Sequence, residues 1–322
     1  MLETKSIQSS SVIIINPKSQ GGATENNTVL SKILNELFHK SKIIYTKKHG
    51  DATRLTRYYL KRGYKEVVAV GGDGTINEVA NGFFEYDEGS NNVKYINPKA
   101  IFSFIPSGTR NVFANSLNLP MDLEEYIKKK DELKPKKIDV ISAQYTIPGT
   151  KKFSKPRLCC NAVEIGAGAE IIERSKLVRN KVNNRLLSTI TGIISTLPAY
   201  ESNLCEIILD GEINIKLNIT MCIISNGKYL GGSFKVAPQA QIDDGFLDII
   251  IVKNSGSFKM LKELISMKSG VYYEKRNILY FRAKKIYLES KEREVSLSLD
   301  GEPIGALPAS FQVLQKKLLM KF

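Results

Sequence analysis

The first part of the chain, about 130 residues, alternates short apolar runs with stretches of helical spacing. Apolar and largely β-branched runs at residues 12–15, 43–46, 67–70 and 100–105 predict strands. Residues 28–38 and 52–61 predict helices between them, and residues 89–99 predict a polar loop. This alternation is typical of βαβ units and therefore predicts an α/β domain with an open, mostly parallel sheet.

The pattern changes after the basic run at residues 128–130. Longer strand-like runs follow at residues 205–209, 213–224, 246–252, 285–288 and 295–299. Asp210-Gly211, between the first two runs, is a type I′ hairpin signal. This part of the chain therefore predicts a β-rich, antiparallel second domain of the sandwich type.

The most informative segment follows the strand at residues 67–70. Residues 71–78 read GGDGTINE, and a helix is predicted from Ile76 onward. Because glycine has no Cβ and tolerates positive φ, backbone N–H groups here can approach a phosphate closely. A tight turn without a ligand is the alternative, but the interleaved Asp, Thr and Asn favour a phosphate site at a helix N-terminus. Loops of similar character follow the strands at 12–15 and 100–105, and we expect all three to converge.

Composition narrows the choice of partner. The net charge of +14 indicates an anionic partner. The chain has no Trp and no common nucleic-acid-binding motif, so we expect no nucleic acid. The four cysteines lie in or beside apolar runs without a C-x-x-C pair, which predicts buried free thiols. No signal peptide and no apolar run of the ~20 residues that span a bilayer are recognised, which predicts a cytoplasmic protein, peripheral at the inner membrane face.

Residues 170–197 combine basic and apolar positions. The basic side chains precede the apolar stretch and are Arg174, Lys176, Arg179, Lys181 and Arg185. Such a segment is typical either of a helix that lies on a membrane or of an ordinary helix with one solvated face. Both interpretations stay open, and an anionic membrane surface is one candidate partner.

Five segments together resemble the diacylglycerol kinase-like lipid kinases, the family of bacterial diacylglycerol kinases and sphingosine kinases. They are NPKSQGG at 16–22, GGDGTINEV at 71–79, PSGTRN at 106–111, DDGFLD at 243–248 and DGEP at 300–303. GGDGT alone also occurs in NAD kinases and phosphofructokinases, whereas the five segments in this order are specific. The resemblance implies a nucleotide-binding α/β domain at residues 1–133 with a C-terminal return at 308–322. Residues 134–307 would form a β-rich lipid-substrate domain.

The resemblance also implies roles for individual residues. Glu302 would be the catalytic base that accepts the proton of the acceptor hydroxyl. Asp244 would bind Mg²⁺ together with the backbone carbonyls of Gln241 and Phe246. Asp73 is expected to face Mg²⁺ or its waters, because a carboxylate repels bare phosphate. The residues expected to bind ATP are Asn16, Thr46, Gly72, Asp73, Gly74, Thr75, Ile76, Asn77, Glu78 and Thr109.

These expectations predict an ATP- and Mg²⁺-dependent lipid kinase acting on diacylglycerol or a related lipid alcohol. Val112 stands where many bacterial members have Asp, so the identity of the lipid stays open. An NAD kinase-like phosphotransferase for a soluble substrate is one alternative, and DGEP with the DDG segment speaks against it. A non-catalytic nucleotide- or membrane-binding module is another, and intact Asp73, Asp244 and Glu302 speak against that. A homodimer is a candidate assembly.

Overall fold

The computed structural model describes residues 11–19, 34, 41–87, 92–121, 123–179, 185–197, 200–231, 234–253, 266, 269–270 and 277–322. The chain forms two compact units. The first comprises residues 1–114, 118–137 and 318–322, and the second comprises residues 115–117 and 138–317. Except for Leu34, the helix predicted at 28–38 lies outside the described residues, as do Gln20, Gly21 and Gly22 of the NPKSQGG segment.

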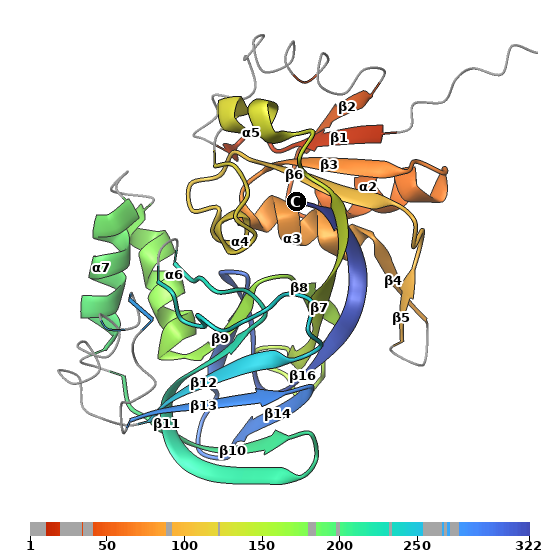
Figure 1. Cartoon of the computed structure of the whole chain (residues 1–322). Helices are drawn as coiled ribbons and strands as arrows, with labels where there is room; N and C mark the ends of the chain where they lie inside the picture. Colours follow the sequence, from red (N-terminus) through yellow and green to blue (C-terminus); the bar gives the residue numbers. More distant parts are fainter. Residues whose placement is uncertain are drawn as a thin grey trace, which may run out of the picture. The chain divides into compact units, whose positions relative to one another are not determined.

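The first unit contains a parallel arrangement of strands (Figure 1). Its strands are β1 (Ser11–Ile15), β2 (Lys42–Tyr45), β3 (Glu66–Gly71) and β6 (Ile101–Pro106), in the order β2-β1-β3-β6. The end of β16 (Glu302–Lys321) adds a further parallel pairing to β6, with Met320 opposite Phe102. Every residue of β1 is buried, which explains its continuous apolar run. The four strands predicted here are confirmed.

The helices of this part are α2 (Asp51–Lys61), α3 (Asp73–Gly82), α4 (Val112–Ser116) and α5 (Leu123–Lys129). The prediction that the third helix starts at Ile76 was wrong, because α3 already begins at Asp73. The predicted polar loop at 89–99 was also wrong in its described part. There β5 (Val93–Tyr95) pairs with β4 (Phe84–Tyr86), and the rings of Phe84 and Tyr95 lie 4.4 Å apart.

The second unit is built mainly from antiparallel strands. Its strands are β7 (Pro135–Thr146), β8 (Arg157–Cys159), β9 (Ala162–Gly166), β10 (Asn203–Leu209), β11 (Ile213–Ser225), β12 (Leu247–Lys253), β13 (Ile278–Ala283), β14 (Lys285–Ser290), β15 (Ser296–Leu299) and most of β16. Neighbours in the order β13-β12-β11-β10-β14-β16 run antiparallel. Asp210 and Gly211 have φ of 51° and 79°, as the hairpin signal predicted.

Two helices, α6 (Ala167–Arg179) and α7 (Arg185–Thr196), pack against each other in the second unit. Arg174 donates a hydrogen bond to the carbonyl of Ser195 at 2.6 Å. Lys181 and the side chains of Arg179 and Arg185 lie outside the described residues. All four cysteines of the chain are buried and free. In the part of the chain that the structure describes, no helix combines the length and apolar character needed to cross a membrane.

The expected fold class is confirmed only in part. The β-rich antiparallel second domain is present, but the sheet is largely antiparallel and the first-unit strands do not form a separate open sheet. The reason is β16, a strand of 20 residues. Its first part pairs antiparallel with β14 and β15, and its last residues pair parallel with β6. A single long strand thus takes part in both kinds of pairing.

Candidate functional site

The loops that follow β1, β3 and β6 meet at the carboxyl ends of these parallel strands. Asn16 donates from Nδ2 to Oγ1 of Thr75 at 3.1 Å, which joins the loop after β1 to α3. The hydroxyls of Ser19 and Ser107 lie 3.1 Å apart, and the N–H of Ser107 donates to the carbonyl of Gly71 at 2.8 Å. The predicted convergence of the three loops is therefore observed.

Gly72 and Gly108 contact each other where these loops meet. A Cβ added to Gly108 would lie 2.3 Å from the Cα of Gly72. None of Gly71, Gly72 and Gly74 has a positive φ, so the missing Cβ is the property of glycine that matters at these positions. Gly72 and Gly108 are explained by close backbone approach, and Gly74 lies in the first turn of α3.

The N-terminus of α3 starts at this contact. Gly72 is the N-cap residue and provides no side-chain cap, and its carbonyl accepts the N–H groups of Thr75 and Ile76 at 2.9 and 3.1 Å. The N–H groups of a first helical turn and the helix dipole together favour an anion. Asp73 accepts the N–H of Phe113 at Oδ1, at 3.1 Å, and so holds the start of α4.

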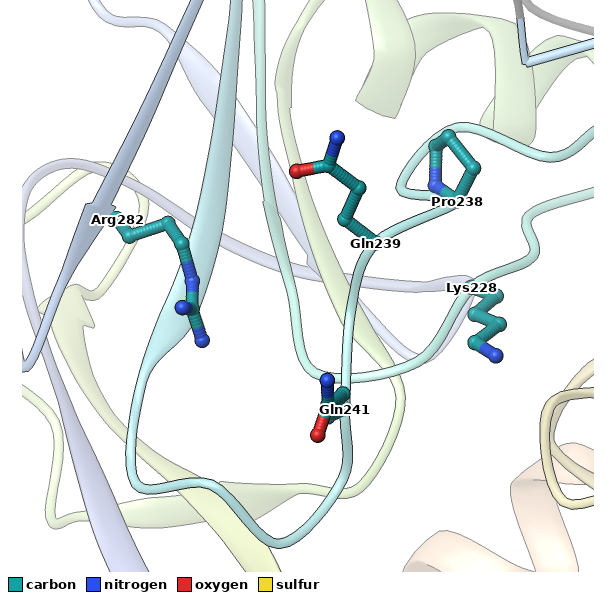
Figure 2. Close-up of a pocket in the computed structure, with 5 residues that line it drawn as sticks. All are labelled: Lys228, Pro238, Gln239, Gln241 and Arg282. Atoms are coloured by element: carbon teal, nitrogen blue, oxygen red, sulfur yellow. The ribbon is translucent and has the colours of Figure 1, made fainter.

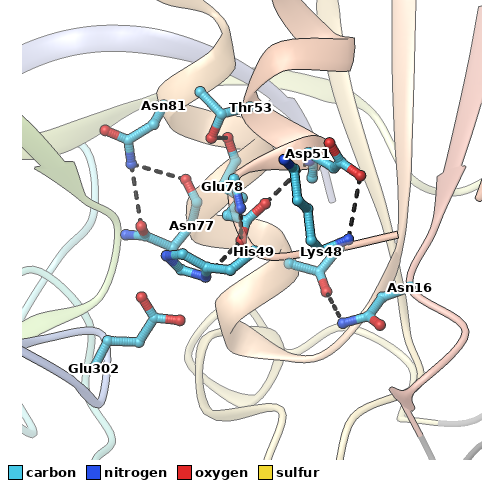
Figure 3. A network of polar contacts seen from close by, with 12 residues as sticks. Asn16, Lys48, His49, Asp51, Thr53, Asn77, Glu78, Asn81 and Glu302 are labelled. Carbon is cyan, nitrogen blue, oxygen red and sulfur yellow. Dashed lines mark hydrogen bonds and ion pairs between the residues drawn. The ribbon is translucent and has the colours of Figure 1, made fainter. Parts of the chain in front are cut away.

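Glu78 ties α3 to the N-terminus of α2 (Figure 3). Its carboxylate accepts the N–H groups of Gly50 and Ala52 at 2.9 and 3.0 Å, and Nδ1 of His49 lies 3.0 Å from Oε1. Thr53 donates to the Glu78 carbonyl at 2.7 Å. Glu78 was predicted to contact ATP, and in this structure its carboxylate holds the start of α2.

Asp51 holds the loop between β2 and α2. Its carboxylate is buried and accepts the N–H groups of Lys47 and Lys48 at 2.9 and 3.2 Å. The hydrogen bond from Lys47, followed by those from Arg54 and Lys48, lowers the pKa of Asp51 although burial acts in the opposite direction. The adjoining Thr46 donates its N–H to the carbonyl of Ile15 at 2.9 Å. The loop after β2 is therefore fixed beside the loop after β1.

The remaining predicted nucleotide residues differ in exposure. Thr109 is exposed on the loop after β6. Ile76 and Asn77 are both only 1% exposed, and Asn81 donates to the backbone carbonyl of Asn77 at 2.8 Å. All ten predicted nucleotide residues lie in the first unit, but these two side chains point into its interior and offer a ligand only their backbone.

In the second unit, Glu302 opens β16 and forms an ion pair with Arg157. The Nη2 of Arg157 lies 2.7 Å from Oε2 of Glu302, and the two side chains are 24% and 23% exposed. The carboxylate of Glu302 is thus oriented by a partly buried guanidinium at the start of β8. This geometry presents a carboxylate that is paired with a cation and still partly exposed to solvent, as access of an acceptor hydroxyl requires.

Asp300 fixes the turn that carries Glu302. Asp300 and Gly301 both have positive φ, 48° and 76°. The Asp300 carboxylate accepts three backbone N–H groups from the turn after β8 and the first residue of β9, which belong to Cys160, Asn161 and Ala162 at 2.9, 2.8 and 3.1 Å. The first residue of DGEP is therefore an anchor for the turn.

The predicted metal residues lie on the segment before β12. Asp244 accepts the N–H of Phe246 at 3.0 Å, and its other oxygen is bonded to Arg282. Asp248 is buried, and burial raises its pKa. Its Oδ2 has no hydrogen-bond partner. The Asp244 carboxylate and the nearby backbone carbonyls are hard oxygen donors of the kind that Mg²⁺ prefers, so their chemistry fits the ion. Among the described residues no group of three His, Cys, Asp or Glu side chains forms a metal site.

Asp139 is a further residue of this region, which no motif in the sequence marks. It is fully buried, accepts the N–H of Gly245 at 2.7 Å with Oδ2, and accepts the N–H of Lys316 at 2.6 Å with Oδ1. Its own N–H donates to the carbonyl of Ile242 at 2.6 Å. Burial raises the pKa of Asp139, although the two accepted N–H bonds act against that. Asp139 thus holds both ends of the segment that carries Asp244. The one signal in the sequence is an acid inside the apolar run 138–141.

A polar pocket of about 400 Å³ opens beside the same segment (Figure 2). Its lining residues are Lys228, Pro238, Gln239, Gln241 and Arg282. Two cations and two amides line it, which suits a polar or anionic group. Arg282 connects this pocket to Asp244, and Gln241 connects it to the predicted metal segment.

Comparisons with known proteins agree with these observations. Residues 10–143 match the family model "Diacylglycerol kinase catalytic domain", and residues 161–320 match "YegS C-terminal NAD kinase beta sandwich-like domain". The chain is 27% identical over 276 residues to the diacylglycerol kinase of Bacillus subtilis, covering 84% of this chain and 81% of the relative. It is 28% identical over 280 residues to the diacylglycerol kinase of Staphylococcus carnosus, covering 85% and 81%.

Solved structures share the fold. The crystal structure of a diacylglycerol kinase from Bacillus anthracis superposes with a TM-score of 0.67 at 24% identity, covering 98% of this chain and 97% of the other. Yeast NADH kinase complexed with NADH superposes with a TM-score of 0.52 at 12% identity, covering 97% and 82%. The fold is therefore of the NAD kinase and diacylglycerol kinase type. Because the two family models together match most of its length, the chain belongs to the diacylglycerol kinase-like lipid kinases, a family of phosphotransferases.

Proposed function

We propose that the protein transfers the γ-phosphoryl group of ATP to the hydroxyl of a membrane lipid, with diacylglycerol or a related lipid alcohol as the acceptor. Membership of a lipid kinase family supports the reaction class. The names of the relatives from B. subtilis and S. carnosus support diacylglycerol as the first acceptor to test. The first unit would bind the nucleotide, and the second unit would bind the lipid.

The observation that carries this proposal is the convergence of three strand-end loops at the N-terminus of α3. The contact between Gly72 and Gly108 leaves backbone without side chains at this point, next to the first helical turn. Backbone N–H groups there would hold phosphate oxygens of ATP. Thr109, exposed on the loop after β6, would add a hydroxyl donor.

Mg²⁺ would be held in the second unit by Asp244 with the carbonyls of Gln241 and Phe246. When bound, the ion would offset negative charge on the transferred phosphoryl group. The contribution of the chain is to hold the segment that carries Asp244 in place. Asp139 accepts the N–H of Gly245, directly after Asp244, and keeps the segment in one conformation. Arg282 neutralises the Asp244 carboxylate in this structure.

Glu302 would accept the proton of the acceptor hydroxyl at one carboxylate oxygen. Its partner Arg157 occupies Oε2, so Oε1 is the oxygen that we assign to the hydroxyl. Asp300 supports this arrangement because its carboxylate accepts three backbone N–H groups and holds the turn. Loss of the proton as the oxygen–phosphorus bond forms avoids a positively charged intermediate.

The test is incubation of the purified protein with ATP and Mg²⁺ against a panel of acceptors. The panel contains diacylglycerol, monoacylglycerol, ceramide, sphingosine and NAD, and products are resolved by mass. We expect phosphate on one or more lipid alcohols and none on NAD. Phosphorylation of NAD alone would replace the proposal with a soluble kinase activity, and no product from any acceptor would contradict it.

A further inference from the structure

The connection between β7 and β8 is an ordered hairpin that leaves seven consecutive residues exposed, 147–153. Thr146 and Phe153 form a β-bridge at its base. The N–H of Ile147 donates to the carbonyl of Lys152, and the N–H of Thr150 donates to the carbonyl of Ile147, both at 3.0 Å. This hairpin, residues 146–155, is hereafter the β7–β8 hairpin.

The hairpin carries large apolar side chains next to cations. Ile147 is 42% exposed and Phe153 is 48% exposed. Lys151, Lys152 and Lys155 are exposed and lie close to them in the sequence. The chain has no acidic residue between Asp139 and Glu164, so none of these lysines has an acidic neighbour along the chain. Exposed apolar side chains flanked by lysines are typical of elements that insert at the headgroup level of a membrane.

Another hairpin of the same unit provides a contrast. In the β10–β11 connection, Ile213 is 51% exposed, and its neighbours in the sequence include the acidic residues Asp210 and Glu212. Acidic side chains are repelled by an anionic membrane surface, whereas each Lys near such a surface contributes roughly 1 kcal/mol to binding. Both hairpins therefore expose apolar side chains, and they differ in the sign of the charged residues beside them.

The β7–β8 hairpin leads directly into the strand that carries Arg157, the partner of the proposed catalytic base Glu302. Arg157, the ion-pair partner of Glu302, follows Phe153 by four residues in the sequence. Four residues of extended chain reach about 13 Å at most. Thr146, at the other side of the base, donates to the carbonyl of Pro308 on β16 at 3.0 Å. Docking of the tip would bring the headgroup layer within reach of Glu302.

We propose that the β7–β8 hairpin docks the enzyme on anionic membranes, with Ile147 and Phe153 inserted at headgroup level and its lysines on lipid phosphates. The proposal rests on the proposed lipid kinase function, because that function requires access to an acceptor that stays in the bilayer. It concerns a surface different from the basic segment of α6 and α7.

Sedimentation with vesicles of phosphatidylglycerol and phosphatidylcholine tests it. An Ile147→Ser, Phe153→Ser double variant should bind about tenfold more weakly, from the apolar area lost. A Lys151→Gln, Lys152→Gln, Lys155→Gln triple variant should bind on the order of 100-fold more weakly at low salt. Ile213→Ser is the matched control, because it removes an equally exposed apolar side chain from the acidic hairpin, and it should bind like wild type.

A second readout is independent of affinity. An environment-sensitive dye on Thr150→Cys should shift to the blue when vesicles are added, and the native cysteines are buried and react little. All hairpin variants should keep wild-type turnover on a short-chain, water-soluble acceptor. The short-chain acceptor separates the two proposals. A variant that no longer binds vesicles but still phosphorylates this acceptor has lost docking and has kept the kinase activity.

Wild-type sedimentation of both hairpin variants would overturn the proposal. If Leu177→Ser, which removes a side chain 62% exposed on α6, released the protein instead, the helix pair would be the docking surface. A dye that does not shift on vesicles which the protein binds would also contradict insertion of the tip. If no acceptor is phosphorylated while the hairpin variants still lose binding, the docking proposal stands and the lipid kinase proposal fails.

Discussion

Arg157 and Glu302 form a 2.7 Å ion pair that joins the start of β8 to the start of β16. Because both side chains are mostly buried, this contact is less screened by water and salt than a surface ion pair. It leaves Oε1 of Glu302 outside the pair while fixing the orientation of the carboxylate. The candidate base is therefore positioned by a residue 145 positions earlier in the chain.

Replacement of Arg157 by Met should lower turnover by about 10- to 100-fold, because the Glu302 carboxylate loses its orienting partner. The KM for ATP should stay near the wild-type value. Arg157→Lys should restore part of the loss. Steady-state kinetics on a short-chain acceptor give these values, and Arg174→Gln, which removes an exposed ion pair with Glu170, is the control. Unchanged turnover in Arg157→Met would show that the pair has no part in the reaction.

Gly108→Ala should weaken nucleotide binding by about tenfold or more, because its Cβ would lie 2.3 Å from the Cα of Gly72 and separate the loops. Calorimetric titration with an ATP analogue measures this. Gly82→Ala is the control, since its Cβ would clash with Thr56 at the opposite end of α3. That variant should lose stability and, once folded, keep nucleotide affinity. Equal affinity in Gly108→Ala and wild type would remove these loops from the nucleotide site.

Asp139→Asn should raise the Mg²⁺ concentration needed for half-maximal activity by about tenfold, since an amide accepts only one of the two backbone N–H groups. The free energy of unfolding should fall by about 1–3 kcal/mol. Binding of Mn²⁺, followed by magnetic resonance without substrate, separates a metal effect from a loss of turnover. Asp131→Asn, at an exposed position, is the control. If a folded Asp139→Asn protein has an unaltered metal titration, Asp139 contributes to the stability of the fold and not to metal binding.

The lowered pKa of Asp51 predicts how the stability of the fold depends on pH. Hydrogen bonds from Lys47, Arg54 and Lys48 lower its pKa in the folded state. Its ionised form therefore stabilises the fold above about pH 4, and this contribution is lost as the pH falls through the lowered pKa. Thermal unfolding of wild type and Asp51→Asn should differ by a constant amount from pH 7 to about pH 5, and the difference should shrink below about pH 4. A constant difference down to pH 2.5 (about 1.5 pH units further) would contradict this assignment.

The sequence predicted the elements whose signals are local. The strands at β1, β3 and β6 appear as continuous apolar runs because both sides of them are buried. The turn at Asp210 was predicted because Asp-Gly favours two successive residues at positive φ, a property of the local residues alone. The family resemblance rested on the same kind of local motif.

What the sequence did not reveal depends on distant contacts. Asp139 binds backbone groups 106 and 177 residues away, so its own neighbours carry no sign of its role. The mutual contact of Gly72 and Gly108 likewise exists only once β3 and β6 pair. The start of α3 at Asp73 was missed because glycines at a helix N-terminus resemble a loop until the strand before them is placed.

The most direct test of the account follows the γ-phosphoryl group itself. Purified wild type and Glu302→Gln are incubated with γ-labelled ATP, Mg²⁺ and diacylglycerol in mixed micelles, and the lipid product is analysed by mass. With wild type, we expect the label on the lipid hydroxyl. With Glu302→Gln, we expect the rate to fall about 10²- to 10⁴-fold while ATP affinity is kept. Label that never reaches a lipid, or equal rates in the two proteins, would contradict the proposed function.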